Sequence, residues 1–89
     1  MQTIPTALQT TIQLREFVTS NFYVPSTLPL DDTSSLLAQG IIDSTGVLEL
    51  VSFVEDRFGI SVQDEELVPA NFDSLAALCA YVERKRALP

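Results

Sequence analysis

The chain has no histidine and few of the other side chains from which catalytic and metal sites are built. Its 89 residues include one cysteine, Cys79, and one lysine, Lys85. A serine nucleophile needs an adjacent base, and without histidine the sequence argues against a catalytic serine. The same absence argues against a histidine-based metal centre. A single cysteine excludes an internal disulfide and fits a reducing compartment.

Long hydrophobic runs are also missing. No apolar stretch approaches the length needed to span a bilayer, and the N-terminus lacks the basic region and apolar core of a signal peptide, so we expect a cytoplasmic protein. Hydrophobic residues still make up 46% of the sequence and charged residues 19%, which indicates a folded globular domain. We expect one domain over residues 1–89, with a core at about 6–86 and flexible termini.

The charge is strongly one-sided. The formal net charge is −7, and residues 31–66 hold nine of the twelve acidic residues against a single base, Arg57. A field of this sign should repel nucleic acid and anionic membranes and attract basic protein surfaces. An acidic face that only aids solubility is the alternative. The basic run at 84–86 suits a helix C-terminus better than a nucleic-acid site, because it lacks area and aromatic neighbours.

Apolar periodicity predicts helices, and no strand pattern extends beyond a few residues. A first helix is expected from Pro5 or Thr6 to Asn21, a second from Ser44 to Phe58, with Gly59 as its stop, and a last one from Asp73 or Ser74. The residues expected to face the core of the first helix are Leu14, Phe17 and Val18, with Leu8 and Ile12 beside them. In the second helix they are Val47, Leu50, Val51, Val54 and Phe58, with Leu48 widening the stripe. In the last helix they are Leu75, Leu78, Cys79 and Val82.

A long loop and a short helix complete the expected fold. Residues 23–40 are rich in proline, serine and aspartate, which favour irregular backbone. Loops of this length are often functional, but packing is expected here through Leu28, Leu30, Leu36 and Leu37. A short helix is expected around Asp64 to Leu67, ended by Pro69. The predicted fold class is all-α, a small four-helix bundle with three main helices and one short helix.

The segment from Gly40 to Ser44 places a serine at the start of the second helix. Unpaired backbone N–H groups and the positive end of the helix dipole favour a phosphoryl group attached there. An ordinary N-cap is the alternative interpretation of Ser44. On the helix that follows, four polar residues at helical spacing form a ridge that is expected to contact a partner: Thr45, Glu49, Ser52 and Asp56.

These features occur together in one known family. Their order is a long first helix, a long loop, Gly40 and hydrophobic residues before Asp43-Ser44, then Glu49-Leu50 and Phe58-Gly59, then Asp64-Glu65 and Phe72 before the last helix. Over nearly its full length the chain thereby resembles the acyl carrier and peptidyl carrier protein family in its free-standing form. In that family a phosphopantetheinyl transferase moves 4′-phosphopantetheine from coenzyme A to the serine. The arm then holds an acyl or aminoacyl cargo as a thioester.

The resemblance implies that Ser44 is the attachment residue, that Asp43 belongs to the same cofactor-binding motif, and that the chain is not an enzyme. Asp73-Ser74-Leu75 matches the family's usual Asp-Ser-Leu spelling better, but Ser74 is explained as the cap of the last helix. Glu49 and Asp56 occupy positions that contact partners in the family.

The cargo is less well indicated. Thr45-Gly46 departs from carriers of fatty-acid synthesis and resembles carriers of specialised metabolism that adenylating enzymes load, including with amino acids such as proline. Downstream tailoring or condensing enzymes would be further partners of a monomeric carrier. The alternatives are a carrier for fatty-acid synthesis and an unmodified helical protein-interaction domain.

Two other groups of residues are weaker candidates for a site. Cys79 shares an apolar stripe with Leu78 and Val82, which predicts a buried, inert thiol. The acidic runs at 31–32 and 64–66 lack the alternating spacing of a calcium loop, so no metal is expected.

Overall fold

The computed structural model describes residues 6–24 and 30–87, and within them the regular structure is helical. The elements are α1 (Thr6–Asn21), α2 (Ser44–Phe58), the 3-10 turn η1 (Asp64–Glu66), α3 (Pro69–Phe72) and α4 (Leu75–Ala87). The predicted all-α bundle of three main helices and one short helix is confirmed. Leu28 and the termini expected to be flexible, 1–5 and 88–89, lie outside the described residues.

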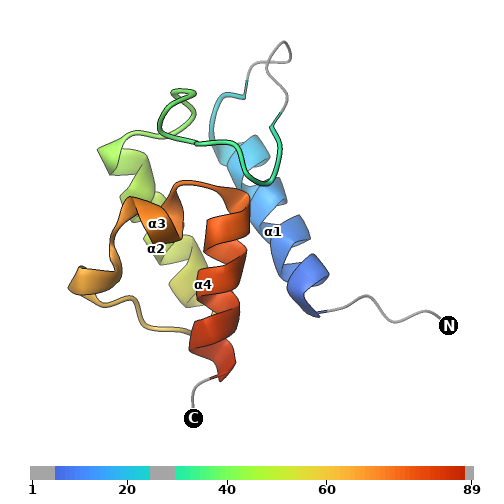
Figure 1. The fold of residues 1–89 in the computed structure, drawn as a ribbon, viewed down its shortest axis with the longest axis vertical. Coiled ribbons are helices and arrows are strands. Elements are labelled where there is room, and N and C mark those ends of the chain that lie inside the picture. The colour runs from blue at the N-terminus through green and yellow to red at the C-terminus, as the bar shows by residue number, and fades with distance from the viewer. Residues whose placement is uncertain (1–5, 25–29, 88–89) are drawn as a thin grey trace, which may run out of the picture.

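Helix α4 is the element that the other three helices contact (Figure 1). Helix α1 lies along one side of α4, while α2 and the short α3 lie on its other side. The core between them consists of side chains that are at most 5% exposed: Leu14, Val18, Leu36, Ile41, Ile42, Leu50, Val54, Phe72, Leu75, Leu78, Tyr81 and Val82. Removing this apolar surface from water is the main favourable term for the fold.

Several apolar residues that were expected in the core are not buried there. Leu8, Ile12 and Leu48 are 49%, 41% and 60% exposed, so these predictions were wrong. Cys79 is only partly buried, and its Sγ lies 3.3 Å from the carbonyl oxygen of Ala7. For Leu8 and Ile12 the reason is that α1 buries only a narrow stripe of its surface. Its buried residues recur every four positions: Thr10, Leu14 and Val18.

Thr10 is a buried polar residue that the sequence pattern did not reveal. It is 1% exposed, and its hydroxyl donates a hydrogen bond to Glu83 Oε2 across the α1–α4 contact at 3.2 Å. A buried hydroxyl needs such a partner, because its desolvation is otherwise uncompensated. The contact therefore fixes which face of α1 meets α4.

The loop before α2 is held against the start of α4 by Asp73. One oxygen of the Asp73 carboxylate accepts a hydrogen bond from Ser35 Oγ at 2.6 Å, and the other accepts one from the N–H of Leu37 at 2.9 Å. The Asp73 carbonyl accepts a further bond from the N–H of Leu36 at 2.7 Å. Leu36 is fully buried between these bonds. The loop thus packs as predicted through Leu36.

The other described leucines of this loop are less buried. Leu30 is partly buried and packs against the core. Leu37 is 39% exposed, so its predicted packing was wrong. The N–H of Leu37 is fixed by Asp73 while its side chain remains at the surface.

The segment between α2 and α4 differs in detail from the prediction. The 3-10 turn lies at Asp64–Glu66, close to the expected short helix, but Pro69 does not simply end it. Pro69 begins α3 instead. Proline suits the first position of a helix, because its missing N–H has no partner there and its φ is already helical.

The loop tether by Asp73 is testable with an isosteric variant. Asp73→Asn keeps the shape but removes the negative charge, so the bonds to Ser35 and to the N–H of Leu37 are no longer charge-assisted. We expect the free energy of unfolding in urea to fall by about 1–2 kcal/mol. Asp31→Asn, which removes an exposed charge from the same loop, is the matched control and should change it by less than about 0.5 kcal/mol. Equal effects of the two variants would contradict the tether.

Candidate functional site

Helix α2 begins with Asp43 as its N-cap. The backbone of Asp43 is extended, with φ −120° and ψ −170°, and its Oδ1 accepts a hydrogen bond from the N–H of Gly46 at 2.8 Å. Its carbonyl accepts the first helical bond, from the N–H of Val47 at 3.0 Å. The carboxylate also lies at the positive end of the helix dipole. The capping role considered for Ser44 therefore belongs to Asp43.

The Ser44 side chain is exposed at the first helical position. Within residues 6–24 and 30–87, its hydroxyl takes part in no hydrogen bond. Ser74, the other serine that follows an aspartate, is only partly exposed, and its Oγ accepts a hydrogen bond from the N–H of Ala77 at 3.0 Å. The predicted capping role of Ser74 is confirmed. Of these two hydroxyls, the one at Ser44 is free to react.

A left-handed glycine and two hydrogen bonds fix the backbone that leads to Ser44. Gly40 has a φ of +72°, a left-handed conformation that favours glycine. After it, Ile41 and Ile42 are buried, and their N–H groups donate to the carbonyl of Leu36 at 2.9 and 3.3 Å. The chain thus reaches Ser44 from a packed turn, and the hydroxyl is displayed on a rigid support.

Gly46 has a packing role that the sequence alone did not reveal. It is buried in the first turn of α2, and a Cβ atom there would lie 3.0 Å from Phe22 Cε1 and 3.1 Å from Ile42 Cβ. The absence of a side chain lets the aromatic ring of Phe22, just beyond α1, approach the helix two residues after Ser44. Gly46 therefore allows a contact that a larger residue would obstruct.

The four residues of the predicted ridge lie in one groove. Thr45, Glu49, Ser52 and Asp56 are all exposed, and all of them line an open groove of about 730 Å³ between α2 and α1. We call it the acidic groove. Its remaining lining residues were not predicted as site residues: Phe17, Asn21, Leu48, Phe53 and Arg57.

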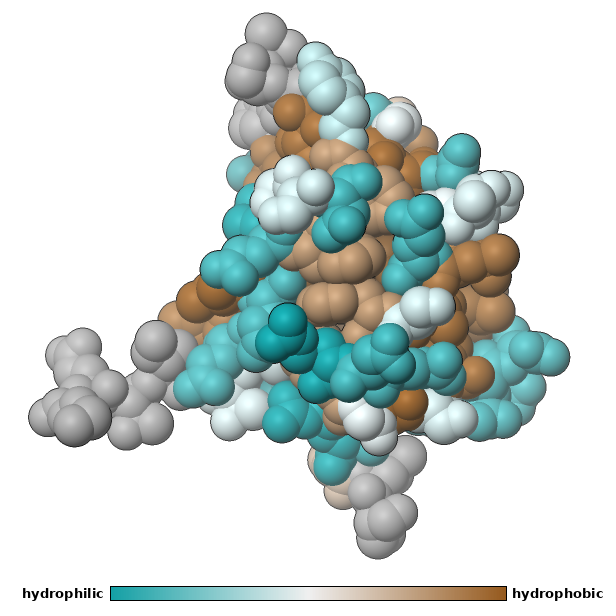
Figure 2. Space-filling view, turned by 180° about the vertical axis from the view of Figure 1, so that it is seen from behind, coloured by the Kyte–Doolittle hydropathy of each residue, from teal (hydrophilic) through white to brown (hydrophobic). Residues whose placement is uncertain are grey.

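Aromatic rings form the base of the acidic groove. Phe17 and Phe53 stack with ring centroids 4.1 Å apart, and the Arg57 guanidinium lies 5.8 Å from the Phe53 centroid. Figure 2 views the molecule from the side opposite to Figure 1, and there tan apolar side chains occupy the middle of the face with teal hydrophilic side chains along much of its border. A partner that combines an apolar side chain with basic neighbours matches this surface.

A second groove opens at Ser44 itself. It measures about 340 Å³, and its other lining residues are apolar: Leu37, Val47, Leu48, Leu67, Val68, Pro69 and Phe72. We call it the apolar groove. Leu48 lines both grooves and is 60% exposed, although it was expected on the core stripe. The sequence signal for this groove was the apolar character of Leu67 and Val68 outside any long helix.

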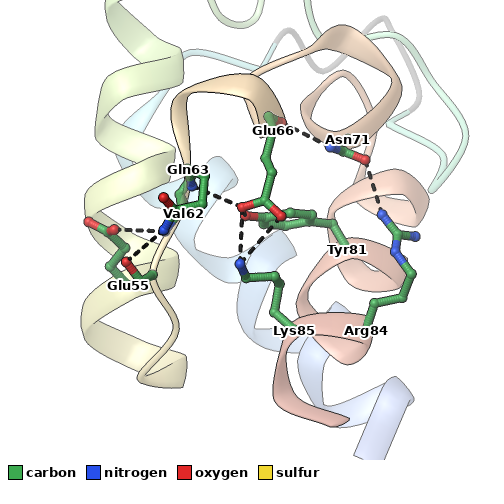
Figure 3. Close-up of polar contacts among 9 residues, drawn as sticks. Glu55, Val62, Gln63, Glu66, Asn71, Tyr81, Arg84 and Lys85 are labelled. Atoms are coloured by element: carbon green, nitrogen blue, oxygen red, sulfur yellow. Dashed lines mark hydrogen bonds and ion pairs between the residues drawn. The ribbon is translucent and has the colours of Figure 1, made fainter. Parts of the chain in front are cut away.

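A cluster of polar contacts lies behind one wall of the apolar groove (Figure 3). Glu66 Oε1 accepts hydrogen bonds from the N–H of Gln63 at 2.9 Å, the Tyr81 hydroxyl at 2.9 Å and Lys85 Nζ at 3.0 Å. The Gln63 N–H and the Lys85 ammonium hold the pKa of Glu66 below its usual range. Burial and the bond to Glu66 raise the pKa of Tyr81 well above its ordinary value. Near neutral pH, Glu66 is therefore an ionised acceptor and Tyr81 a protonated donor.

Within the described residues, no group of three or more histidine, cysteine, aspartate or glutamate side chains is placed to hold a metal ion. Among the helices of that same part of the chain, none has the length and apolarity needed to cross a membrane.

Two comparisons with known proteins bear on this site. Residues 9–82 match the family model described as the phosphopantetheine attachment site. The chain is also similar to a protein of Serratia sp. (strain ATCC 39006) named probable acyl carrier protein PigG. The two are 33% identical over 60 residues, which cover 67% of this chain and 69% of that protein.

The packing role of Gly46 can be tested by adding one methyl group. Replacing a helical glycine with alanine normally stabilises a helix by about 1 kcal/mol. Here we expect Gly46→Ala to lower the free energy of unfolding by about 1 kcal/mol, because the new Cβ overpacks Phe22 and Ile42. The loss should be smaller in a Phe22→Leu background. If Gly46→Ala instead raises the free energy of unfolding by about the usual 1 kcal/mol, Phe22 moves aside freely and the packing role is contradicted.

Proposed function

This chain belongs to the phosphopantetheine attachment family and is a carrier protein, and we propose that Ser44 is the residue that bears its 4′-phosphopantetheine arm. The observation that carries the proposal is that capping of α2 and the exposed hydroxyl belong to two different residues. Asp43 caps the helix, so the exposed Ser44 hydroxyl has no bond to give up to any residue that the structure describes. The N-terminal end of α2 also favours the phosphate that attachment leaves there.

In the attachment reaction, Ser44 Oγ attacks the phosphorus atom of coenzyme A that bears the pantetheine arm. A new bond forms between Oγ and phosphorus, while the bond from phosphorus to the bridging oxygen breaks and the adenosine bisphosphate leaves. The serine proton passes to a base on the transferase, while Asp43 keeps its capping bond to the N–H of Gly46. Once attached, the arm supplies a thiol that holds the cargo as a thioester.

The chain's own contribution is to display Ser44 and to be recognised. The acidic groove, with Glu49 and Asp56 on its edge, is the proposed docking surface for the transferase, for an adenylating enzyme that loads the arm, and for downstream tailoring or condensing enzymes. Each exposed charge pair contributes only about 0–1 kcal/mol, so docking is fast and reversible. A carrier must leave each enzyme after a turnover, and weak contacts suit that need. The flexible arm in turn raises the local concentration of cargo at the docked enzyme.

For the cargo, we propose an aminoacyl group of specialised biosynthesis, with proline as one candidate. The support is the Thr45-Gly46 sequence after Ser44, which resembles carriers loaded by adenylating enzymes. A fatty-acyl cargo is the second candidate, and the apolar groove beside Ser44 favours it. In either case the chain presents substrates and performs no catalysis, and a cytoplasmic location fits its single cysteine.

The attachment site can be tested by mass. The protein is incubated with coenzyme A, magnesium and a broad-specificity phosphopantetheinyl transferase, and intact mass and peptide mapping locate the added group. We expect one group, attached to Ser44, and none in Ser44→Ala, whose helical content should be unchanged because Asp43 caps α2. Ser74→Ala is the matched control. It should be modified normally and lose about 1 kcal/mol of stability with its cap. Modification of Ser74, or none with an active transferase, would overturn the proposal.

The docking surface can be tested by charge reversal. We expect Glu49→Lys and Asp56→Lys each to lower kcat/KM of the transferase about tenfold at low ionic strength, and less at high salt. The control is Asp64→Lys, which makes the same change in net charge outside the acidic groove. Thermal unfolding should differ little among the three variants, because all three side chains are exposed. Equal rates for all three would assign the effect to net charge alone and remove the groove from the proposal.

A further inference from the structure

The outer wall of the apolar groove is anchored in the hydrophobic core at one end only. It is formed by residues 67–72, and of its four groove-lining side chains only Phe72 is buried. Leu67 and Val68 are 38% and 41% exposed, and the regular structure nearby is a 3-10 turn and a four-residue helix. Segments with so few buried apolar contacts open at low free energy unless other interactions hold them. Phe72 packs against Tyr81, with ring centroids 5.3 Å apart, and anchors the C-terminal end of the wall. The exposed residues 67–69 depend more on polar contacts.

The polar contacts that hold it converge on Glu66, directly before the wall. Its carboxylate binds the N–H of Gln63 on one side and reaches α4 on the other, where Tyr81 and Lys85 donate to it. Figure 3 shows this carboxylate pointing from the η1 segment toward the two α4 side chains. The second Glu66 oxygen lies 3.3 Å from Lys85 Nζ. The Glu66 side chain thus connects the wall to α4.

The Glu66 backbone takes part in the same attachment. Its carbonyl oxygen accepts a hydrogen bond from Asn71 Nδ2 at 2.9 Å, which closes the wall segment on itself. Asn71 Oδ1 in turn accepts one from Arg84 on α4 at 3.1 Å. The wall is therefore connected to α4 at both of its ends.

These bonds are favourably placed. The side chains of Lys85 and Glu66 are only 17% and 27% exposed, so water screens their attraction less than it does at the open surface. Tyr81 is 1% exposed, and its hydroxyl would be left buried without a partner if Glu66 moved away. Charge-assisted hydrogen bonds are also stronger than neutral ones. The cluster thus attaches the start of the wall to α4 through a charged side chain.

We propose that Glu66 is a positioning residue for the carrier function: it latches residues 67–72 to α4 and so sets the shape of the apolar groove in which an apolar cargo on the Ser44 arm is shielded. The inference rests on the proposed attachment at Ser44. Because Ser44 itself lines this groove, the groove is the nearest apolar surface to any group attached there. An apolar cargo that folds back against the protein meets the latched wall first.

The latch can be tested in the unmodified protein, whatever is attached to Ser44. The variants are Glu66→Gln and Lys85→Met, and the matched controls are Glu65→Gln and Arg86→Met, which remove the same charges one residue away. In hydrogen exchange, we expect the amides of residues 67–72 to exchange about threefold faster or more in the two latch variants and unchanged in the controls. The double variant should be no worse than the worse single variant, because both remove one interaction. Equal exchange in latch and control variants overturns the proposal.

The consequence for the cargo is tested on loaded protein. A transferase that accepts acyl-coenzyme A is used to attach octanoyl and acetyl arms, and cleavage of the thioester by hydroxylamine is followed by mass. We expect Glu66→Gln to accelerate octanoyl cleavage about threefold or more and to leave acetyl cleavage unchanged, since the acetyl group has too little apolar surface to be held in the groove. General destabilisation would affect both cargoes alike. Equal effects, or no effect, overturn the shielding role. If no arm is added at Ser44, the proposed function fails, while the exchange experiment still decides the latch.

Discussion

The hydrogen bond from the N–H of Gly46 to the Asp43 carboxylate is the contact on which the site depends. It fixes where α2 begins, and it satisfies an orphan donor of the first turn without using the serine. If Ser44 were the cap, its hydroxyl would have to leave a structural bond before it could react. With Asp43 as the cap, the reactive group and the stabilising group are adjacent but separate. The buried turn before Asp43 then holds this arrangement in place.

Acidic residues that contribute to one negative field in the sequence have two different roles in the structure. Asp43, Asp73 and Glu66 each accept backbone N–H groups, and each fixes a segment next to Ser44. Glu55 does the same for the N–H of Val62. Glu49 and Asp56 remain exposed along the acidic groove. Some of the carboxylates thus hold the backbone around Ser44, and others stay exposed on the proposed docking surface.

The two grooves give the carrier two surfaces with different chemistry on either side of Leu48. The acidic groove has an aromatic base and a charged edge, which suits brief recognition by a basic partner. The apolar groove begins at Ser44 and suits the cargo. The exposed Leu48 lines both grooves, so the proposed docking surface and the proposed cargo surface are adjacent. Helix α4 supports this arrangement from behind, because it holds α1 on one side and, through Glu66, the groove wall on the other.

The sequence by itself determined the helices, the start of α2 at Ser44, the cap at Ser74 and the alignment of the polar ridge, because these depend on local periodicity and capping. It also indicated the family. Only the tertiary structure decided which aspartate caps and which one tethers a loop, that Gly46 admits Phe22, that Leu48 faces solvent, and that Glu66 reaches Tyr81 and Lys85. These contacts join residues distant in sequence or depend on the direction of one side chain. Periodicity can place a residue on a helix face, but only the packed fold decides what that face meets.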